Sequence, residues 1–527
     1  MVANAFLKSN VVFEPLIRGW YAWLHLLAPA QSALNLKYRQ IPLLESFLEH
    51  PDVHANAAAN PKLFGGPFVQ LRREQEADVR KHLFGICSTF EREIRFAEIL
   101  AAACQRVAKE SGHSLSKSYA ELPPELAGLV EFVYDANHHA RLRLHERILY
   151  ANPPRTGGEA IELSICESKD RAFFMNTPRL KCRENPRVEL AFASELVDQI
   201  AAARTKPTSP NELAEALKMD EQQRERLFEL FTESGPSSDQ REFSGEGVRV
   251  RYFGHACVLM QTREFSLLID PVFATDRAAG NSLTIADLPD RIDCVIITHG
   301  HQDHCAIEWL LQVRHRVDEV WVPRNNSGSL VDPSLELMLR QAGFRKVRSL
   351  EPLDVVDIPG GRVVSLPFSG EHVDLECFSR QGLLIEMLGR RIGFLVDSDG
   401  RDSALYGRIA DLVGANLDAL FLGMECHGAP LSWLYGPTTS RPLPRKDDES
   451  RRLSGMDCER AVAVLSKFEV NNIFVYAMGQ EPWLRYLMGL EYTPESIQLR
   501  EVAKFLSVCR QQGKSAEQLF LSKELML

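Results

Sequence analysis

The stretch VIITHGHQDHCAIEW, residues 295–309, places three histidines and an aspartate within six positions, directly after an apolar run. The apolar run predicts a buried strand that ends just before the first histidine. His299 and His301 are two positions apart, so in extended backbone their side chains point the same way. Asp303 and His304 follow in the turn and face the same space from the other side. The spacing predicts two neighbouring metal positions, one at His299 and His301 and one at Asp303 and His304.

From residue 248 onward, short strand-like apolar runs end in polar clusters, with helical segments between several of them. This pattern predicts a layered α/β domain. Open α/β sheets carry their chemistry at the carboxyl ends of the strands, and the strand-like runs here end in further possible ligands. These are the neighbours Glu371 and His372, the pair Asp397 and Asp399, and His427.

We expect only one residue of each pair to bind a metal. Glu371 and His372 are adjacent, and the residues alone do not choose between them. Asp397 is favoured over Asp399 because it is nearer the end of its strand. For His427, metal binding and a role facing the substrate or supporting the ligands are equally open.

The first half of the chain has a different pattern of apolar and polar residues. Apolar residues near a 3.6-residue period predict a helix over residues 76–110. ARLRLHERILY (140–150) and AIELSICES (160–168) alternate apolar and polar positions around a turn-rich stretch, which predicts a β-hairpin. The hairpin would carry a basic face, formed by Arg141, Arg143, His145 and Arg147. We interpret that face as solvated surface, whose other possible role is to meet an acidic carrier protein.

The segment 233–247 is polar and rich in glycine and serine, and it is the best candidate for a linker. We therefore predict an N-terminal α+β domain over residues 1–240 and a catalytic domain over residues 247–527. The N-terminal domain is expected to contact a carrier protein or a second copy of the chain. The length of 527 residues suits two or more domains of ordinary size.

The composition argues against several classes of protein. The net charge of −10 at pH 7 does not suit a general nucleic-acid binder. Eleven cysteines without a CxxC pair suit the reducing cytoplasm. The apolar segment 19–33 is too short and too interrupted by polar residues to cross a bilayer, so we expect a buried or interface helix there.

GHACVLM and SLLIDPVF, followed by THGHQDH, resemble the metallo-β-lactamase superfamily over about residues 248–476. The resemblance implies an αββα sandwich around two metals. It also implies that Asp270, in the IDP motif, supports the metal site and that Asp397 is the bridging carboxylate.

The sequence departs from the hydrolases of that superfamily, which normally supply two more histidines. One would fall in SGEHVD, residues 369–374, where either Glu371 or His372 can serve; the other would fall near the C-terminus, and no histidine follows His427. The site is therefore poorer in nitrogen and richer in oxygen than a zinc hydrolase site. Zinc has no redox chemistry, whereas carboxylate-rich sites with a few histidines suit iron that binds dioxygen. The ligand set favours iron.

A closer resemblance covers the whole chain, which is similar to the diiron β-hydroxylases of nonribosomal peptide antibiotic biosynthesis. Those enzymes carry HxHxDH, then a glutamate 72 residues and an aspartate 98 residues after the first histidine; counting from His299 reaches Glu371 and Asp397. The resemblance implies that these two carboxylates are catalytic and that Asp397 bridges two irons. By the same resemblance, one iron takes His299, His301 and Glu371, and the other takes Asp303 and His304. Asp270, His372 and His427 are left to support the ligands or to face the substrate.

The resemblance also implies the reaction. One oxygen atom of O₂ is inserted into the β C–H bond of an amino acid held as a thioester on the carrier domain of a nonribosomal peptide synthetase. No dinucleotide, P-loop or iron–sulfur motif is present, so we expect an external reductase to supply the electrons. We further expect a cytoplasmic homodimer with no nucleic-acid or membrane partner.

Two alternatives stay open at this point. A zinc-dependent hydrolase of phosphodiesters, thioesters or lactones would hold zinc in place of iron. A scaffold protein with a degenerate site is the other, and the intact HxHxDH argues against it.

Overall fold

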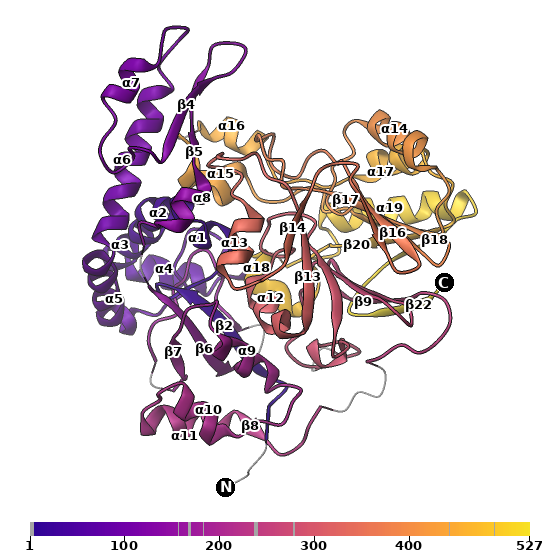
Figure 1. The fold of residues 1–527 in the computed structure, drawn as a ribbon, viewed down its shortest axis with the longest axis horizontal. Coiled ribbons are helices and arrows are strands. Elements are labelled where there is room, and N and C mark those ends of the chain that lie inside the picture. The colour runs from indigo at the N-terminus through magenta and orange to yellow at the C-terminus, as the bar shows by residue number, and fades with distance from the viewer. Residues whose placement is uncertain are drawn as a thin grey trace.

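The computed structural model describes residues 5–155, 157–166, 170–182, 184–236, 241–277, 280–441, 443–489 and 491–527. The C-terminal half contains two large sheets, and the mainly helical N-terminal half lies against one side of them (Figure 1). No helix in these ranges is both long and apolar enough to cross a membrane.

The C-terminal half is built on two seven-stranded sheets, each partly parallel and partly antiparallel. Across the first sheet the strands are β14 (Val347–Leu350), β13 (Val317–Pro323), β12 (Ile292–Ile296), β11 (Ser266–Ile269), β10 (Cys257–Gln261), β9 (Arg249–Gly254) and β22 (Lys523–Met526). Across the second they are β15 (Val355–Ile358), β16 (Gly361–Leu366), β17 (Gly382–Met387), β18 (Arg390–Phe394), β19 (Ala419–Gly423), β20 (Asn472–Tyr476) and β21 (Ser515–Gln518). Apolar side chains from the facing surfaces of both sheets form one buried core.

Helices cover the outer face of each sheet (Figure 1). The first sheet is covered by α12 (Ile307–Val313) and α13 (Leu335–Gln341). The second is covered by α14 (Ser403–Val413), α17 (Cys458–Leu465) and α19 (Ile497–Gln511). Three short helices complete this half: α15 (Leu431–Tyr435), α16 (Arg445–Ser450) and α18 (Arg485–Met488). The predicted αββα class is confirmed.

The N-terminal half contains a four-stranded sheet, two smaller strand pairs and eleven described helices. The sheet has the order β3 (Trp20–Tyr21), β2 (Val11–Ile17), β6 (Glu159–Ile165) and β7 (Arg187–Glu189). The pairs are β1 (Phe6–Leu7) with β8 (Phe231–Thr232), and β4 (Val130–Tyr134) with β5 (Ala140–Leu144). The helices are α1 (Leu24–Leu27), α2 (Pro29–Asn35), α3 (Ile41–Glu49), α4 (Pro51–Ala58), α5 (Glu76–Thr89), α6 (Glu91–Val107), α7 (Ser116–Ala120), α8 (Glu146–Ala151), α9 (Glu195–Ala202), α10 (Pro210–Ala216) and α11 (Glu221–Glu229).

Two local expectations are corrected. The single helix predicted over 76–110 is two helices, because Phe90 leaves helical geometry and its ring lies against Arg18. The predicted hairpin of 140–150 with 160–168 is wrong: β5 pairs with β4, and β6 pairs with β2 and β7. Alternation identifies a strand but not its partner, and in the structure β6 lies between β2 and β7 in one sheet.

The basic face expected on that hairpin is solvated: Arg141, His145 and Arg147 are exposed, and Arg143 is half-buried. Arg141 pairs with Glu376, and Arg143 donates to the carbonyl of Ser327. Both partners belong to the C-terminal half, so these two arginines also make an intramolecular contact. A role of this face in meeting an acidic carrier protein stays a prediction.

The two halves share one apolar cluster. All seven residues of α12 are buried, because the helix lies between the first sheet and the N-terminal half, where it contacts α9 and β2. The apolar segment 19–33 forms β3, α1 and part of α2 and is largely buried, as expected; the apolar residues of β3 and α1 belong to this cluster, and Ala30 and Ala33 of α2 belong to a second one. The proposed boundary between the domains falls between β8 and β9, and residues 237–240 lie outside the described residues. That division stays a prediction.

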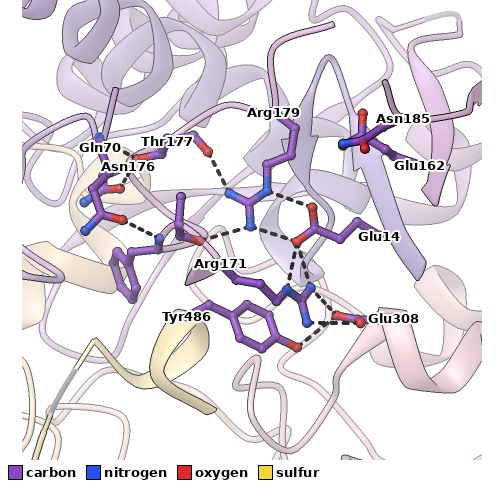
Figure 2. Close-up of polar contacts among 12 residues, drawn as sticks. Glu14, Gln70, Glu162, Arg171, Asn176, Thr177, Arg179, Asn185, Glu308 and Tyr486 are labelled. Carbon is purple, nitrogen blue, oxygen red and sulfur yellow. Dashed lines mark hydrogen bonds and ion pairs between the residues drawn. The ribbon is translucent and has the colours of Figure 1, made fainter. Parts of the chain in front are cut away.

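A buried ion network crosses between the halves (Figure 2). The guanidinium of Arg171 contacts Glu14 at 2.7 Å and Glu308, in α12, at 2.8 Å. Arg179 contacts Glu14 at 2.9 Å, and the hydroxyl of Tyr486 donates to Glu308 at 2.9 Å. Arginine can make several such bonds at once because its donors form a planar fork. The network ties the N-terminal half to the helix that follows the histidine cluster.

Candidate metal centre

The predicted site residues meet at one edge of the sandwich, where strands of both sheets end. Asp270 directly follows β11, the histidine cluster follows β12, and Asp397 follows β18. Glu371 lies in the loop after β16. All of these side chains are buried. The loops at the carboxyl ends of strands thus bring together residues that are far apart in the sequence.

Three groups of side chains each bring their ligand-type atoms within 4.8 Å of one another. The groups are His299 with His301 and Glu371, His299 with His304 and Asp397, and His255 with Asp303 and His304. All six side chains predicted to bind metal converge in one cluster. Asp397 lies with one histidine from each predicted metal position, which is the arrangement expected of a bridging carboxylate.

Hydrogen bonds orient His304 toward the cluster. Its Nδ1 donates to Oδ2 of Asp270 at 2.8 Å, and its Nε2 faces Oδ2 of Asp397 at 2.9 Å. The backbone N–H and the hydroxyl of Thr298 donate to Asp270 at 2.8 and 2.5 Å. A histidine that binds a metal through one nitrogen is usually held through the other in this way. Asp270 therefore orients His304 from the side away from the cluster.

The donor atoms at the centre fit cations. Nε2 of His304, Oε2 of Glu371 and Oδ1 of Asp397 are buried without a hydrogen-bond partner among the described residues. Oε2 of Glu371 lies 2.7 Å from Nδ1 of His301 but outside hydrogen-bonding geometry. Burial and the adjacent histidines lower the pKa of His299 well below its ordinary value, so its ring is neutral at pH 7 and offers a lone pair. Buried carboxylates and open lone pairs are costly without a cation, and mixed nitrogen and oxygen donors suit iron or zinc.

His255 joins the cluster although the sequence analysis did not single it out. The backbone N–H of Gly479 donates to Nδ1 of His255 at 3.2 Å, so the ring proton is on Nε2, which faces Oδ2 of Asp303 at 3.0 Å. His255 therefore orients Asp303 as Asp270 orients His304. In the sequence, His255 stands out only because it lies in GHACVLM, directly after β9. It is 48 residues before Asp303, so no local pattern connects the two residues.

The remaining predicted residues are in none of the three groups. His372 is buried, and its ring stacks on that of His301, with centroids 4.5 Å apart. Asp399 accepts from Ser369 at 3.1 Å and pairs with Arg401. His427 is exposed and lines a cavity beside the cluster. Within the two predicted pairs, Glu371 and Asp397 are therefore the members that converge with the histidines.

Comparison with known proteins agrees with this geometry. A family model described as the diiron non-heme β-hydroxylase N-terminal domain matches residues 6–235, and a β-lactamase superfamily domain matches residues 249–394. The chain is 33% identical to the 4-amino-L-phenylalanyl-[CmlP-peptidyl-carrier-protein] 3-hydroxylase of Streptomyces venezuelae, over 99% of each protein. The chain belongs to the diiron β-hydroxylase family.

The likeness of this diiron β-hydroxylase to its relatives extends to three dimensions. The crystal structure of CmlA, a diiron β-hydroxylase from Streptomyces venezuelae, matches it with a TM-score of 0.91 at 32% identity and covers 100% of both chains. A UPF0173 protein of Pyrococcus abyssi is 28% identical over 24% of this chain and 50% of its own length. The likeness to that protein is confined to part of the chain, whereas the likeness to the hydroxylase spans all of it.

A cavity of about 540 Å³ opens onto the metal cluster of this diiron β-hydroxylase. His301, Asp303, Glu371 and Asp397 line one part of it. Its apolar walls come from both halves of the chain: Phe64, Phe173 and Met175 from the N-terminal half, and Trp433, Leu434, Leu453, Leu487 and Met488 from the C-terminal half. The rings of Phe173 and Trp433 stack across the junction, with centroids 5.9 Å apart. The N-terminal half is therefore part of the cavity wall.

Backbone contacts hold the N-terminal wall in place. The N–H of Phe173 donates to the side chain of Gln70 at 2.7 Å (Figure 2). The side chain of Asn176 donates to the carbonyl of Gly66 at 2.7 Å. A Cβ on Gly65 would lie 2.8 Å from the carbonyl oxygen of Gly489, so only glycine allows the two backbones to cross this closely. These contacts fix the distance between the two walls of the cavity.

Proposed function

We propose that this protein is an O₂-dependent monooxygenase that hydroxylates the β-carbon of an amino acid held as a thioester on a nonribosomal peptide synthetase carrier domain. The observation that carries the proposal is the convergence of six buried donor side chains beside a cavity that has apolar walls from both halves of the chain. The full-length likeness to a hydroxylase that acts on an aminoacyl carrier protein supports the substrate form.

In this proposal two irons are held by the converging side chains. His299, His301 and Glu371 would hold one iron, Asp303 and His304 would hold the other, and Asp397, which lies close to His299 and His304, would serve both. When bound, the reduced iron pair supplies the activation of O₂. Asp270 and His255 keep His304 and Asp303 in position through the hydrogen bonds described above.

The apolar walls have two roles in the proposed reaction. They exclude water from the reacting carbon, and they hold an uncharged aromatic or aliphatic side chain with its β-carbon toward the cluster. A free amino acid offers little area for such orientation. The carrier domain and its long phosphopantetheine arm add remote binding energy, which can be used to place one C–H bond.

The proposed reaction needs electrons from a second protein. The sequence carries no nicotinamide, flavin or iron–sulfur motif, so an external reductase provides two electrons for each turnover. The homodimer and the cytoplasmic location stay predictions.

Three measurements on the protein test the proposal together. Anaerobically iron-loaded protein is expected to hold about two irons per chain, because each metal position has its own ligand set. With a reductant, O₂ and an aminoacyl-carrier protein, intact-protein mass spectrometry is expected to show the carrier arm gaining the mass of one oxygen atom. With ¹⁸O₂ the label is expected in a hydroxyl on the β-carbon.

Three other results would contradict it. They are zinc-dependent hydrolysis with no oxygenation by the iron form, oxygen label that comes from water, and hydroxylation of the free amino acid at the same rate as of the carrier-bound one.

A further inference from the structure

One carboxylate in the cavity is outside the set proposed for the irons. Glu425 follows β19, the strand next to the one that leads to Asp397, and it lines the same cavity as Glu371. Four described carboxylates line that cavity, and the other three belong to the proposed iron set. Glu425 is in none of the three convergent groups. Its position requires a different explanation.

Glu425 has a hydrogen-bond donor but no cationic partner. Its Oε1 accepts from the hydroxyl of Tyr492 at 3.0 Å. Among the described residues no lysine, arginine or histidine forms an ion pair with it. Arg452, which also lines the cavity, is engaged with the carbonyl of Gly428 and with Glu449. A carboxylate in such a place gains most from a cation that arrives from outside the chain.

The electrostatics support an incoming cation. Burial and the charges of Asp303 and Asp397 raise the pKa of Glu425 well above its ordinary value. A cation beside Glu425 would stabilise the ionised carboxylate, which burial disfavours. The described lysine and arginine residues that line the cavity are Lys62 and Arg452.

The proposed substrate carries a cation at a fixed place. The α-ammonium of an aminoacyl thioester is two bonds from the β-carbon, or about 2.5 Å by ordinary bond lengths. When the β-carbon lies over the metal cluster, the ammonium must therefore lie within the cavity and near the cluster. Lys62 and Arg452 would repel it, and Glu425 would attract it.

We propose that Glu425 is the receptor for the α-ammonium of the aminoacyl thioester, and that Tyr492 holds its carboxylate in place. This inference rests on the proposed function and names how the substrate is selected. Together, the thioester arm, the apolar walls and the carboxylate would hold three substituents of the α-carbon. Three fixed points are enough to present one face of the β-carbon to the irons. An acyl group without the amine would lack one of them and leave Glu425 desolvated without a partner.

The test compares aminoacyl with desaminoacyl carriers. Carrier domains are loaded with phenylalanyl or leucyl groups and with their desamino counterparts, 3-phenylpropionyl and 4-methylpentanoyl. Iron-loaded wild-type protein is expected to prefer the aminoacyl form of its better substrate by about 100-fold or more in kcat/KM, because a site built to bind a polar group rejects the analogue that lacks it. Glu425→Gln is expected to bind two irons and to reduce that preference to below about 10-fold.

Two further variants keep the test decisive. Tyr492→Phe removes the hydrogen bond to Glu425 and is expected to give a preference for the aminoacyl form between those of the wild type and of Glu425→Gln. If Glu425→Gln does not fold, the Tyr492 variant replaces it in the test. Glu459→Gln, which changes an exposed carboxylate on α17, is the matched control and is expected to keep the wild-type preference.

The outcomes separate this inference from the function on which it rests. A glutamine variant that keeps the wild-type preference overturns the inference alone, and so does one that loses an iron, because Glu425 would then be a ligand. Wild-type protein that hydroxylates no carrier-bound substrate overturns the proposed function, and the inference with it.

Discussion

Arg171 and Glu308 join the two halves of the protein directly behind the metal cluster. Arg171 lies in the N-terminal half and contacts Glu308 at 2.8 Å; Glu308 is four residues after His304 (Figure 2). The guanidinium also lies over the ring of Tyr486, 3.5 Å from its centroid. Leu487 and Met488, which follow Tyr486, line the cavity. The same arginine thus contacts the helix after the cluster and the segment that forms part of the cavity wall.

Arg171→Met is expected to lower the free energy of unfolding by about 3–5 kcal/mol, because it leaves Glu308 buried without an ion-pair partner and leaves Glu14 with Arg179 alone. Chemical denaturation of the wild-type and variant proteins measures the difference. Arg226→Met is the matched control, since its ion pair with Glu229 is exposed to solvent and is expected to contribute little to the free energy of unfolding. Equal effects of the two substitutions would show that the buried network does not stabilise the junction.

Glu371→Ala is expected to release or weaken one iron and to abolish hydroxylation, because it removes an anionic donor from the group formed with His299 and His301. His372→Ala is the matched control, since its ring stacks on His301 but lies outside that group, and it is expected to keep both irons. Iron analysis after gel filtration measures both. Loss of iron from the His372 variant with retention in the Glu371 variant would reverse the assignment.

Asp270→Asn is expected to reduce the iron affinity of the position at His304 by about 10–100-fold, the usual effect of losing the partner that orients a ligand histidine. Competition with a coloured iron chelator measures the affinity. Asp399→Asn changes a buried carboxylate that pairs with Arg401 and is expected to have a smaller effect on iron. An unchanged affinity in the Asp270 variant would mean that Asp270 has no influence on the metal.

His255→Ala is expected to weaken the iron bound by Asp303 while the iron at His299 and His301 stays, because His255 hydrogen-bonds to Asp303 and packs against the ring of His304, and both are ligands proposed for that one iron. The signature is one iron per chain after mild chelation, where the wild type retains two. His255→Gln keeps a donor on that side and is expected to restore part of the affinity. Loss of both irons together would contradict a local role for His255.

Local spacing in the sequence was enough to identify the metal chemistry. In HxHxDH the four donor residues are within six positions of one another, so the turn after one strand brings them together. The same principle predicted donors at the ends of later strands and, with the family resemblance, selected Glu371 and Asp397, which converge with the histidines in the structure. The structure brings these residues together because strands of one sandwich end at a common edge, and their binding of metal stays a prediction.

Only the tertiary structure decided which distant segments meet. His255, β6 and the apolar wall at Phe173 each depend on a partner far along the chain, and no local pattern names that partner. Alternating residues around 140–168 identified strands but not their pairing, and the buried Arg171 is an ordinary charged residue until Glu14 and Glu308 are placed beside it. The sequence by itself determined the chemistry of the site, because donor type and spacing are local. The cavity, its charge at Glu425 and the junction of the two halves arise only when the whole chain packs into a single core.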